Sequence, residues 1–405
     1  MENKKIWLFW ILVVLTMVFV IADATNPPTQ TEPILNATSW KNLSTSNLTL
    51  LNQSTEDLDG DSVKNIYNWY LDGENIAVLN LPFEGGSNGT WTKDYSIYDN
   101  EVLVINGNWS RTVGYDGFGA YEFDNSDFYE QGWIMGMNVT DADHFTFSDG
   151  ANDLPFSIST WAKVANISLP FLFLTKMADV EGDDNSEYAF FVTQNNLLVL
   201  YLIGATSQDI MYHYYNLSSV NYIEEWTHFA MTYNGSEGVN NSVRFYVNGE
   251  YVPQSILTLG SYHHMRNTPT DVRIGCSGRS SSNGTIDDIV VWNEELTEEQ
   301  ISALYENRTN LIHSSMTGEG DIWNGSITPN DGYIDGVTLT SNLIEVLEDF
   351  NSIPEVANYT LNSTDINNHT NGSLLADWDF YDYEGDSQVM NETRWWNGVV
   401  LNTTF

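Results

Sequence analysis

The sequence has few cysteines and few basic residues, and each shortage excludes a class of protein. Cys276 is the only cysteine in 405 residues, so the sequence offers neither an intramolecular disulfide framework nor a cysteine-based zinc site. We expect Cys276 to be a small buried apolar residue. Lysine and arginine total 14 against 55 aspartates and glutamates, a formal net charge of −41. Nucleic acid and anionic membrane surfaces repel such a chain, so we expect no nucleic-acid partner.

Long hydrophobic runs are also scarce, with one exception at the N-terminus. Residues 6–22 form an uncharged apolar run that follows two lysines, and the small residues Ala22 and Ala24 come at its end. This order predicts a secretory signal peptide over residues 1–24. The run also reaches the lower length limit of a membrane span, so an uncleaved anchor is the alternative. Both alternatives place the rest of the chain outside the cell, with membrane contact only through this segment.

Asn-x-Ser/Thr sequons are abundant along the rest of the chain. Twenty of them occur, from Asn36 to Asn402. Such enrichment fits a glycosylated protein that is extracellular or on the cell surface. The alternative is an Asn- and Thr-rich β protein that carries no sugars.

Aromatic residues make up 13% of the chain, and the pattern in which they occur is that of strands. Short runs of aromatic and β-branched residues alternate with Asn-Gly, Asp-Gly and Gly-Gly turns, of which Asn248-Gly249 is one. Only residues 297–306 predict a helix, with Thr297 as its cap. Many short strands with one short helix predict an all-β protein built from antiparallel sandwiches.

Several motifs in the middle of the chain occur in the order typical of one family. They are residues 79–84 (LNLPFE), 94–100 (DYSIYDN), 120–124 (AYEFD), 156–161 (FSISTW), 226–233 (WTHFAMTY), 245–249 (FYVNG) and 284–292 (GTIDDIVVW). Together they resemble the laminin-G-like, concanavalin A-like jelly-roll family over residues 75–309. The strand pattern favours an inward position for four aromatic residues and His228. The four are Trp161, Trp226, Phe245 and Trp292.

The flanks of this region contain a motif that occurs twice. An acidic loop, an aromatic pair and an x-Gly turn follow one another after residue 57 and again after residue 382. Residues 36–74 and 310–348 resemble the two halves of an immunoglobulin-like repeat of prokaryotic cell-surface proteins. We therefore predict that the jelly roll is inserted in this smaller sandwich at the turn after Gly73. Residues 25–35 are a linker to it.

Residues 352–405 resemble the first half of the same repeat a second time. An unpaired half-sandwich exposes the edges of its strands. We therefore expect this partial second immunoglobulin-like module to pair with another chain or to remain loose.

Two groups of carboxylates are candidate calcium ligands. Asp57, Asp59 and Asp61 alternate within one turn, a spacing that lets their oxygens converge on one ion. A solvated acidic turn is the equal alternative. The family resemblance implies a structural calcium in the jelly roll, which would involve Asp287 or Asp288 together with Asp94 or nearby backbone oxygens.

No catalytic motif accompanies this fold. Predicted strands contain no E-x-D-x-E pattern, and no G-x-S-x-G, H-E-x-x-H or phosphate-binding glycine loop occurs. We therefore expect a non-enzymatic surface protein whose jelly roll binds glycans or surface proteins. The alternatives are a structural surface-layer or spacer protein and, more remotely, a divergent glycan hydrolase.

Overall fold

The structure is a computed structural model that describes most of the chain. Its described residues are 26–38, 42–125, 134–178, 185–236, 241–278, 280–348, 355–367, 372–381, 394–397 and 400–404. The predicted signal or anchor at 1–24 and the second acidic loop at 382–387 lie outside them. Within the described residues, no helix combines the length and apolarity that crossing a bilayer requires. The chain divides into two compact units, Met1–Leu347 and Glu348–Phe405.

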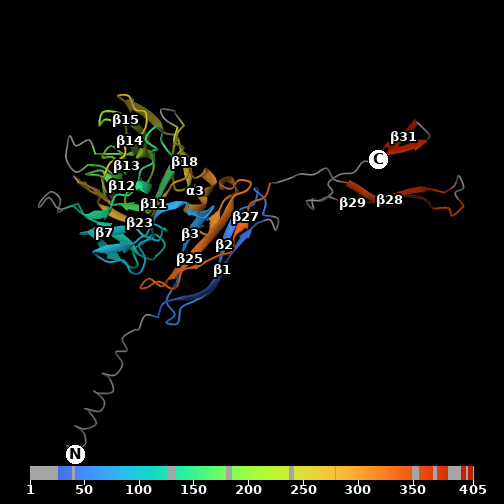
Figure 1. Cartoon of the computed structure of the whole chain (residues 1–405), viewed down its shortest axis with the longest axis horizontal. Helices are drawn as coiled ribbons and strands as arrows, with labels where there is room; N and C mark the ends of the chain where they lie inside the picture. The colour runs from blue at the N-terminus through green and yellow to red at the C-terminus, as the bar shows by residue number, and fades with distance from the viewer. Residues whose placement is uncertain are drawn as a thin grey trace, which may run out of the picture. The chain divides into compact units, whose positions relative to one another are not determined.

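The larger part of the first unit is an antiparallel β-sandwich, which confirms the all-β part of the predicted fold class (Figure 1). Within the described residues one sheet has nine strands in the order β19-β15-β14-β13-β12-β20-β10-β7-β6. These are β6 (Trp91–Lys93), β7 (Glu101–Ile105), β10 (Gly136–Val139), β12 (Phe171–Lys176), β13 (Tyr188–Val192), β14 (Leu197–Ile203), β15 (Ile210–Asn216), β19 (Ser255–Leu259) and β20 (Val272–Ile274).

The facing sheet has eight strands within the same described residues, in the order β18-β17-β16-β11-β23-β9-β8 with β5 on β23. They are β5 (Ala77–Leu81), β8 (Asn108–Ser110), β9 (Ala120–Phe123), β11 (Phe156–Val164), β16 (Thr227–Tyr233), β17 (Val243–Val247), β18 (Glu250–Val252) and β23 (Gly284–Trp292). Short elements complete the sandwich: β21 (Cys276–Ser277), β22 (Ser280–Ser281), and the 3₁₀ turns η1 (Asp143–Phe145) and η2 (Leu217–Ser219).

The main core lies between these two sheets. Ile158, Met231 and Phe245 are opposite one another on β11, β16 and β17 and are fully buried. Side chains alternate between the two faces of a strand, so every second residue of these strands points to the same side. Together these residues form one apolar layer between the sheets. The predicted inward position of Phe245 is confirmed, and Cys276 is buried as expected.

Two local predictions are also confirmed. Asn248 and Gly249 both have positive φ angles, 51° and 77°, as a two-residue hairpin of the predicted type requires. The helix α3 spans Glu298–Tyr305, and the side chain of Thr297 accepts a hydrogen bond from the Gln300 amide at 3.3 Å. This bond satisfies an amide that the first helical turn leaves without a partner.

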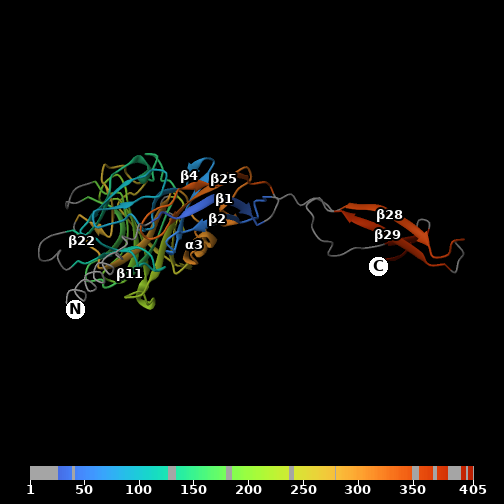
Figure 2. The ribbon, with the colours of Figure 1, turned by 90° about the horizontal axis from the view of Figure 1, so that it is seen from below.

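A smaller sandwich forms from the two flanks of the jelly roll. Strand β3 from the N-terminal flank pairs along its whole length with β25 from the C-terminal flank, antiparallel. Figures 1 and 2 both show the blue strands β1 and β2 beside the orange β25. Its strands are β1 (Thr29–Ala37), β2 (Leu48–Glu56), β3 (Lys64–Leu71), β4 (Glu74–Asn75), β24 (Leu311–Ile312), β25 (Ile322–Asn330), β26 (Leu339–Thr340) and β27 (Ile344–Glu345), with the 3₁₀ turn η3 (Ser314–Met316).

This smaller sandwich shares its core with the outer face of the eight-stranded sheet. Trp323 and Leu50 from its two sheets join one apolar cluster with Tyr246 and Trp292 of the jelly roll. The eight-stranded sheet is therefore covered by protein on both faces. The immunoglobulin-like assignment of the small sandwich stays a prediction.

The second unit contains two antiparallel hairpins. The first pairs β28 (Glu355–Ser363) with β29 (Leu374–Tyr381), and the second pairs β30 (Arg394–Asn397) with β31 (Val400–Thr404).

Candidate functional site

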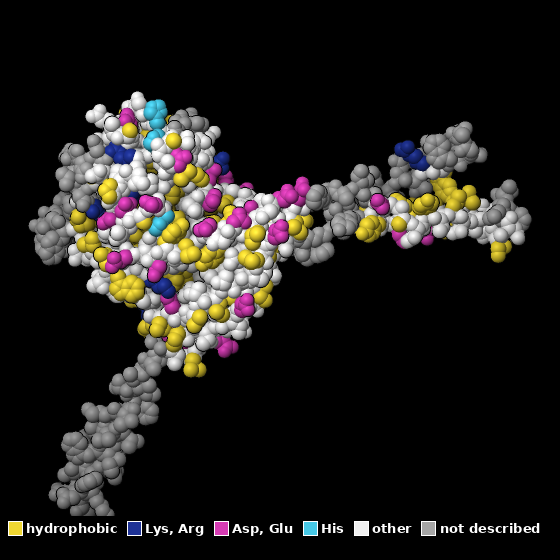
Figure 3. Space-filling view, viewed as in Figure 1, with side chains coloured by type: hydrophobic (Ala, Val, Ile, Leu, Met, Phe, Trp, Pro, Cys, Tyr) yellow, Lys and Arg dark blue, Asp and Glu magenta, His cyan; other side chains and the backbone are white. Residues whose placement is uncertain are grey.

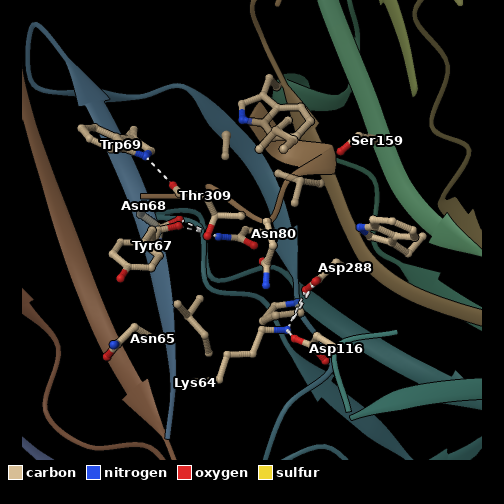
Figure 4. Close-up of a pocket in the computed structure, with 18 of the residues that line it drawn as sticks. Lys64, Asn65, Tyr67, Asn68, Trp69, Asn80, Asp116, Ser159, Asp288 and Thr309 are labelled. Carbon is tan, nitrogen blue, oxygen red and sulfur yellow. Dashed lines mark hydrogen bonds and ion pairs between the residues drawn. The ribbon is translucent and has the colours of Figure 1, made fainter. Parts of the chain in front are cut away.

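A cavity of about 340 Å³ lies between β3 of the small sandwich and the outer face of the eight-stranded sheet. One wall is the run from Lys64 to Trp69, and the opposite wall contains Ser159, Trp161 and Trp292. Helix α3 closes part of the rim with Leu304. Figure 4 shows Lys64, Asp116 and Asp288 meeting in one region of this cavity. The cavity thus forms where the inserted and interrupted sandwiches meet.

Lys64 is the centre of the charged end of the cavity. Its Nζ atom lies 2.6 Å from Glu84 Oε1, 2.8 Å from Asp116 Oδ2 and 3.1 Å from Asp288 Oδ1. The Lys64 side chain is 14% exposed and that of Glu84 is fully buried. One ammonium therefore neutralises part of a buried carboxylate cluster that several separate segments contribute.

Burial disfavours the charged form of these carboxyl groups. It raises the pKa of Glu84 to about 7, although the nearby Lys64 ammonium opposes the rise. Burial likewise raises the pKa of Asp288 to about 6, against the same ammonium. The pKa of Asp287 is raised well above its usual range by burial and by the charge of Asp288. The cluster therefore retains bound protons near neutral pH.

Backbone contacts hold the remaining oxygens of the cluster. Asp287 accepts hydrogen bonds from the amides of Asp288 at 2.8 Å and Tyr115 at 3.0 Å. Gly114 lets the Tyr115 loop approach this closely, because a Cβ atom there would lie 2.5 Å from Asp287 Oδ2. The second oxygen of Glu84 accepts from the Gly119 amide at 3.1 Å.

Amide side chains form the polar middle of the cavity wall. Asn80 Nδ2 donates to Asn68 Oδ1 at 2.9 Å, and Asn68 Nδ2 donates to the Tyr95 carbonyl at 2.6 Å. Trp69 Nε1 donates to the Thr309 carbonyl at 3.0 Å. These bonds satisfy the buried polar groups and orient the wall (Figure 4).

Aromatic rings lie beside the charged cluster, since Trp161 is opposite Asp287 across β11 and β23. Tyr115 and Trp161 stack with ring centroids 4.0 Å apart and an interplanar angle of 8°. Trp161 also stacks with Tyr305 at 5.6 Å and 23°. Tyr305 is 38% exposed, and Trp226 meets Tyr115 edge-on at 6.5 Å. Tyr115 and Trp161 line the cavity as an aromatic wall, and Tyr305 continues their stack toward the surface.

The expectation that Trp161 and Trp226 belong to the sandwich core is wrong. On β11, Ile158 and Ala162 face the interior, so Trp161 lies on the outer face of the sheet and is half-buried. Trp226 comes just before β16 and is also half-buried. Trp292 is buried, but in the core shared with the small sandwich.

His228 lies on the same outer face, next to Trp161. It is buried as expected, yet its Nδ1 has no hydrogen-bond partner within the described residues. Burial lowers the pKa of His228 to about 3, so the ring is neutral at physiological pH. Its ring centroid is 5.3 Å from that of Trp161.

The residues that the resemblance implied for a jelly-roll calcium site have other partners in the structure, and calcium there stays a prediction. Asp287 and Asp288 are in the Lys64 cluster, where an ammonium already provides a positive charge. The two oxygens of Asp94 accept hydrogen bonds elsewhere, from Asn80, Ser96 and Asn100. Five such bonds leave Asp94 little capacity to ligate an ion.

Asp57, Asp59 and Asp61 do come together as the sequence suggests. Each offers an oxygen, and these oxygens lie within 4.8 Å of one another. Hydrogen bonds inside the turn use part of this capacity, since Asp57 Oδ1 accepts from the amides of Asp59 and Asp61. Asp59 also binds the backbone and side chain of Asn26. Calcium at this turn stays a prediction.

Sequence reasoning missed three residues that line the cavity and a fourth, Glu84, that pairs with Lys64 beside it. Lys64, Asp116 and Tyr115 belong to no recognisable motif, and Glu84 is the last residue of the motif at 79–84, which gave no hint of an ion pair. The only available signal was the scarcity of cations, since a lysine in a chain with 14 basic and 55 acidic residues has many possible partners.

Comparisons with known proteins agree with the fold. Residues 139–302 match the family described as the concanavalin A-like lectin/glucanases superfamily, which confirms the jelly-roll resemblance for that part of the chain. No curated protein matches the chain.

Solved structures similar to this chain include binding domains of botulinum neurotoxins. The receptor-binding domain of type G has 14% identity and a TM-score of 0.41, covering 57% of this chain and 51% of that chain. The binding domain of serotype D has 16% identity and a TM-score of 0.42, with coverages of 57% and 52%. The binding domain of neurotoxin DC, in complex with rat synaptotagmin II, has 17% identity and a TM-score of 0.41. The match covers 58% of this chain and 52% of that chain. The chain thus spans about half the length of each.

Proposed function

We propose that the protein is an extracellular, cell-surface binding protein whose concanavalin A-like sandwich binds a glycan or a protein ligand without transforming it. The aromatic wall of the cavity is the observation on which this rests. Ligand sites in proteins are concave, mostly apolar and equipped with a few oriented polar groups. The cavity between β3 and the eight-stranded sheet has that composition.

Chemically, the cavity suits the end of a glycan or one large side chain of a protein. Trp161 is held in place by stacking with Tyr115 and Tyr305, so the part of its ring that lines the cavity binds a ligand with little loss of conformational entropy. Ser159, Asn65 and Asn307 line the same cavity and can form hydrogen bonds with hydroxyl or amide groups. Its volume, about 340 Å³, is at the lower end for ligand pockets.

The carboxylates of the cavity support a binding role over hydrolysis. Asp116 and Asp288 both pair with Lys64, which holds them at one end of the cavity. Glycan hydrolysis needs two carboxyl groups on either side of the bond to be cleaved. The structural spacer is the alternative without a specific ligand.

We expect Trp161→Ala to weaken binding of the full chain to its best ligand on a glycan array by roughly tenfold or more. The reason is that the substitution removes the central ring of the aromatic wall. Trp91→Ala is the matched control, because Trp91 is 44% exposed on β6 of the other sheet. Equal binding of the two variants would contradict a site at the cavity.

The same array, run with and without EDTA, tests the calcium proposal. Loss of binding in EDTA that Asp57→Asn and Asp61→Asn reproduce would place the ion at the acidic turn. No hit together with ordered self-assembly would favour the structural alternative. Release of reducing sugar from a bound polysaccharide would favour the hydrolase.

A further inference from the structure

The C-terminal unit repeats the first hairpin of the small sandwich with the same register. Ala37 of β1 pairs with Leu48 of β2, and Ser363 of β28 pairs with Leu374 of β29. The loops between the strands have equal length. Each begins with the same bond, because the amides of Thr38 and Thr364 donate to the carbonyls of Asn47 and Ser373, both at 2.8 Å.

The second hairpin is repeated as well. Strand β3 pairs with β4 through Tyr70↔Asn75 and Leu71↔Glu74. Strand β30 pairs with β31 through Trp396↔Leu401 and Asn397↔Val400. All four residues follow their counterparts in β3 and β4 by the same number of positions. Two hairpins with matched registers, in the same order, indicate one half-module used twice.

In the first copy, residues 320–346 complete this half-module. Strand β25 pairs with the other edge of β3, and its fully buried Trp323 and Ile327 join the core with Leu35 and Leu50 of the first hairpin. The approach is close, since a Cβ at Gly325 would lie 2.5 Å from Leu50 Cδ2. The first hairpin is therefore buried by an extended segment.

The C-terminal copy presents the corresponding apolar face without a cover among the described residues. Leu361 corresponds to Leu35, yet it is 62% exposed, and its neighbours Tyr359 and Leu374 are 80% and 59% exposed. Apolar residues alternate with polar ones along both strands, so they share one face. Figure 3 shows hydrophobic side chains gathered on the visible side of this unit. Exposed apolar faces of this kind mark interaction sites.

We propose that the apolar face of β28 and β29, together with the edge of β30 opposite β31, is a docking site for an extended segment of a partner protein. The first copy defines the chemistry of that segment. The docking segment would pair antiparallel with β30. It would bury a tryptophan against the apolar face and, four residues later, an isoleucine. A turn and a second short apolar run would follow. Such strand addition combines main-chain hydrogen bonds with side-chain pockets.

A second copy of this chain fits the site poorly. Its own residues 320–346 are already held within its small sandwich, where Trp323 has no exposed surface. Two chains with a formal net charge of −41 each also repel one another. The occupant is therefore not residues 320–346 of a second copy but another, uncommitted segment of the same chemistry.

A synthetic peptide of residues 320–346 serves as the probe, added to the full chain and followed by fluorescence anisotropy. We expect saturable binding, which Leu361→Asp and Leu374→Asp in the full chain each weaken by roughly tenfold or more. Leu257→Asp is the matched control, because Leu257 is 50% exposed but lies on β19 of the jelly roll. This variant should bind the peptide as tightly as the unmodified chain. A peptide with Trp323→Asp and Ile327→Asp should not bind.

Three results would overturn the proposal. One is the absence of saturable binding by the unmodified peptide. Another is binding that Leu361→Asp and Leu374→Asp leave unchanged, which would place the peptide elsewhere on the chain. The third is a dimer in sedimentation velocity that these substitutions abolish, because the occupant would then be a second copy.

Discussion

Replacing Lys64 with methionine is expected to lower the free energy of unfolding by about 3–5 kcal/mol at pH 8, the usual cost of removing one partner from a buried ion pair. Methionine keeps much of the lysine's apolar volume but removes the ammonium. Glu84, Asp116 and Asp288 then face one another without a counter-charge. Chemical denaturation followed by tryptophan fluorescence measures the loss.

The loss of unfolding free energy in Lys64→Met should depend on pH, and the pKa values of the carboxyl groups determine whether it grows or shrinks as pH rises. Glu84 and Asp288 have folded-state pKa values of about 7 and about 6, above their usual values of 4.5 and 3.8. A carboxyl group with a raised pKa binds more protons in the folded state, so its contribution to stability falls as pH rises through that interval. Without Lys64 these pKa values rise further. The deficit of the variant should therefore be smaller at pH 5 and widen toward pH 8.

Lys93→Met provides the control for a less buried ion pair. Lys93 lies 2.6 Å from Asp335, but its side chain is 36% exposed. Exposed pairs contribute about 0–1 kcal/mol. Equal losses in the two variants, or a Lys64→Met deficit that shrinks with rising pH, would contradict the buried-cluster explanation.

Local sequence patterns predicted the features that depend on neighbouring residues. Asn248-Gly249 predicted a hairpin because few other residues adopt two consecutive positive φ angles, and Thr297 predicted the start of α3 because its hydroxyl satisfies an early helical amide. The motifs of the jelly roll likewise predicted an antiparallel sandwich. In each case the determining contacts lie within a few residues or within one family pattern.

The position of Trp161 shows where alternation is insufficient. Alternation tells which residues of β11 share a face, but here both faces of the sheet are covered by protein. Aromatic residues therefore occur on both, and the pattern alone cannot tell the core face from the outer one. The side that carries Ser159 and Trp161 became the cavity wall instead.

The Lys64 cluster could not be predicted because its members are far apart in the sequence. Asp288 lies 224 residues beyond Lys64 and reaches it only because the jelly roll is inserted within the small sandwich. Likewise, the family resemblance implied a cation at Asp287 or Asp288. The structure places a lysine ammonium beside Asp288, and this lysine lies outside the region of the resemblance.

Trp323→Ala is expected to lower the free energy of unfolding by about 3–5 kcal/mol, as truncation of a fully buried aromatic residue does. Trp323 has no exposed surface and meets Trp69 edge-to-face, with ring centroids 6.4 Å apart. Its cluster also contains Tyr246 and Trp292 of the jelly roll. The substitution should therefore lower the stability of both sandwiches in one shared transition.

Far-UV circular dichroism and tryptophan fluorescence, recorded over the same denaturant series, test whether the transition is shared. Coincident curves that shift together to lower denaturant would show that the two sandwiches unfold as one unit. Trp91→Ala controls for the loss of a fluorophore, and because Trp91 is 44% exposed it should shift the midpoint little. If Trp323→Ala instead splits the transition and leaves the main one in place, the sandwiches are energetically independent. The cavity between them would then be a junction that opens without cost to the jelly roll, and ligand affinity would depend on how tightly the small sandwich is held.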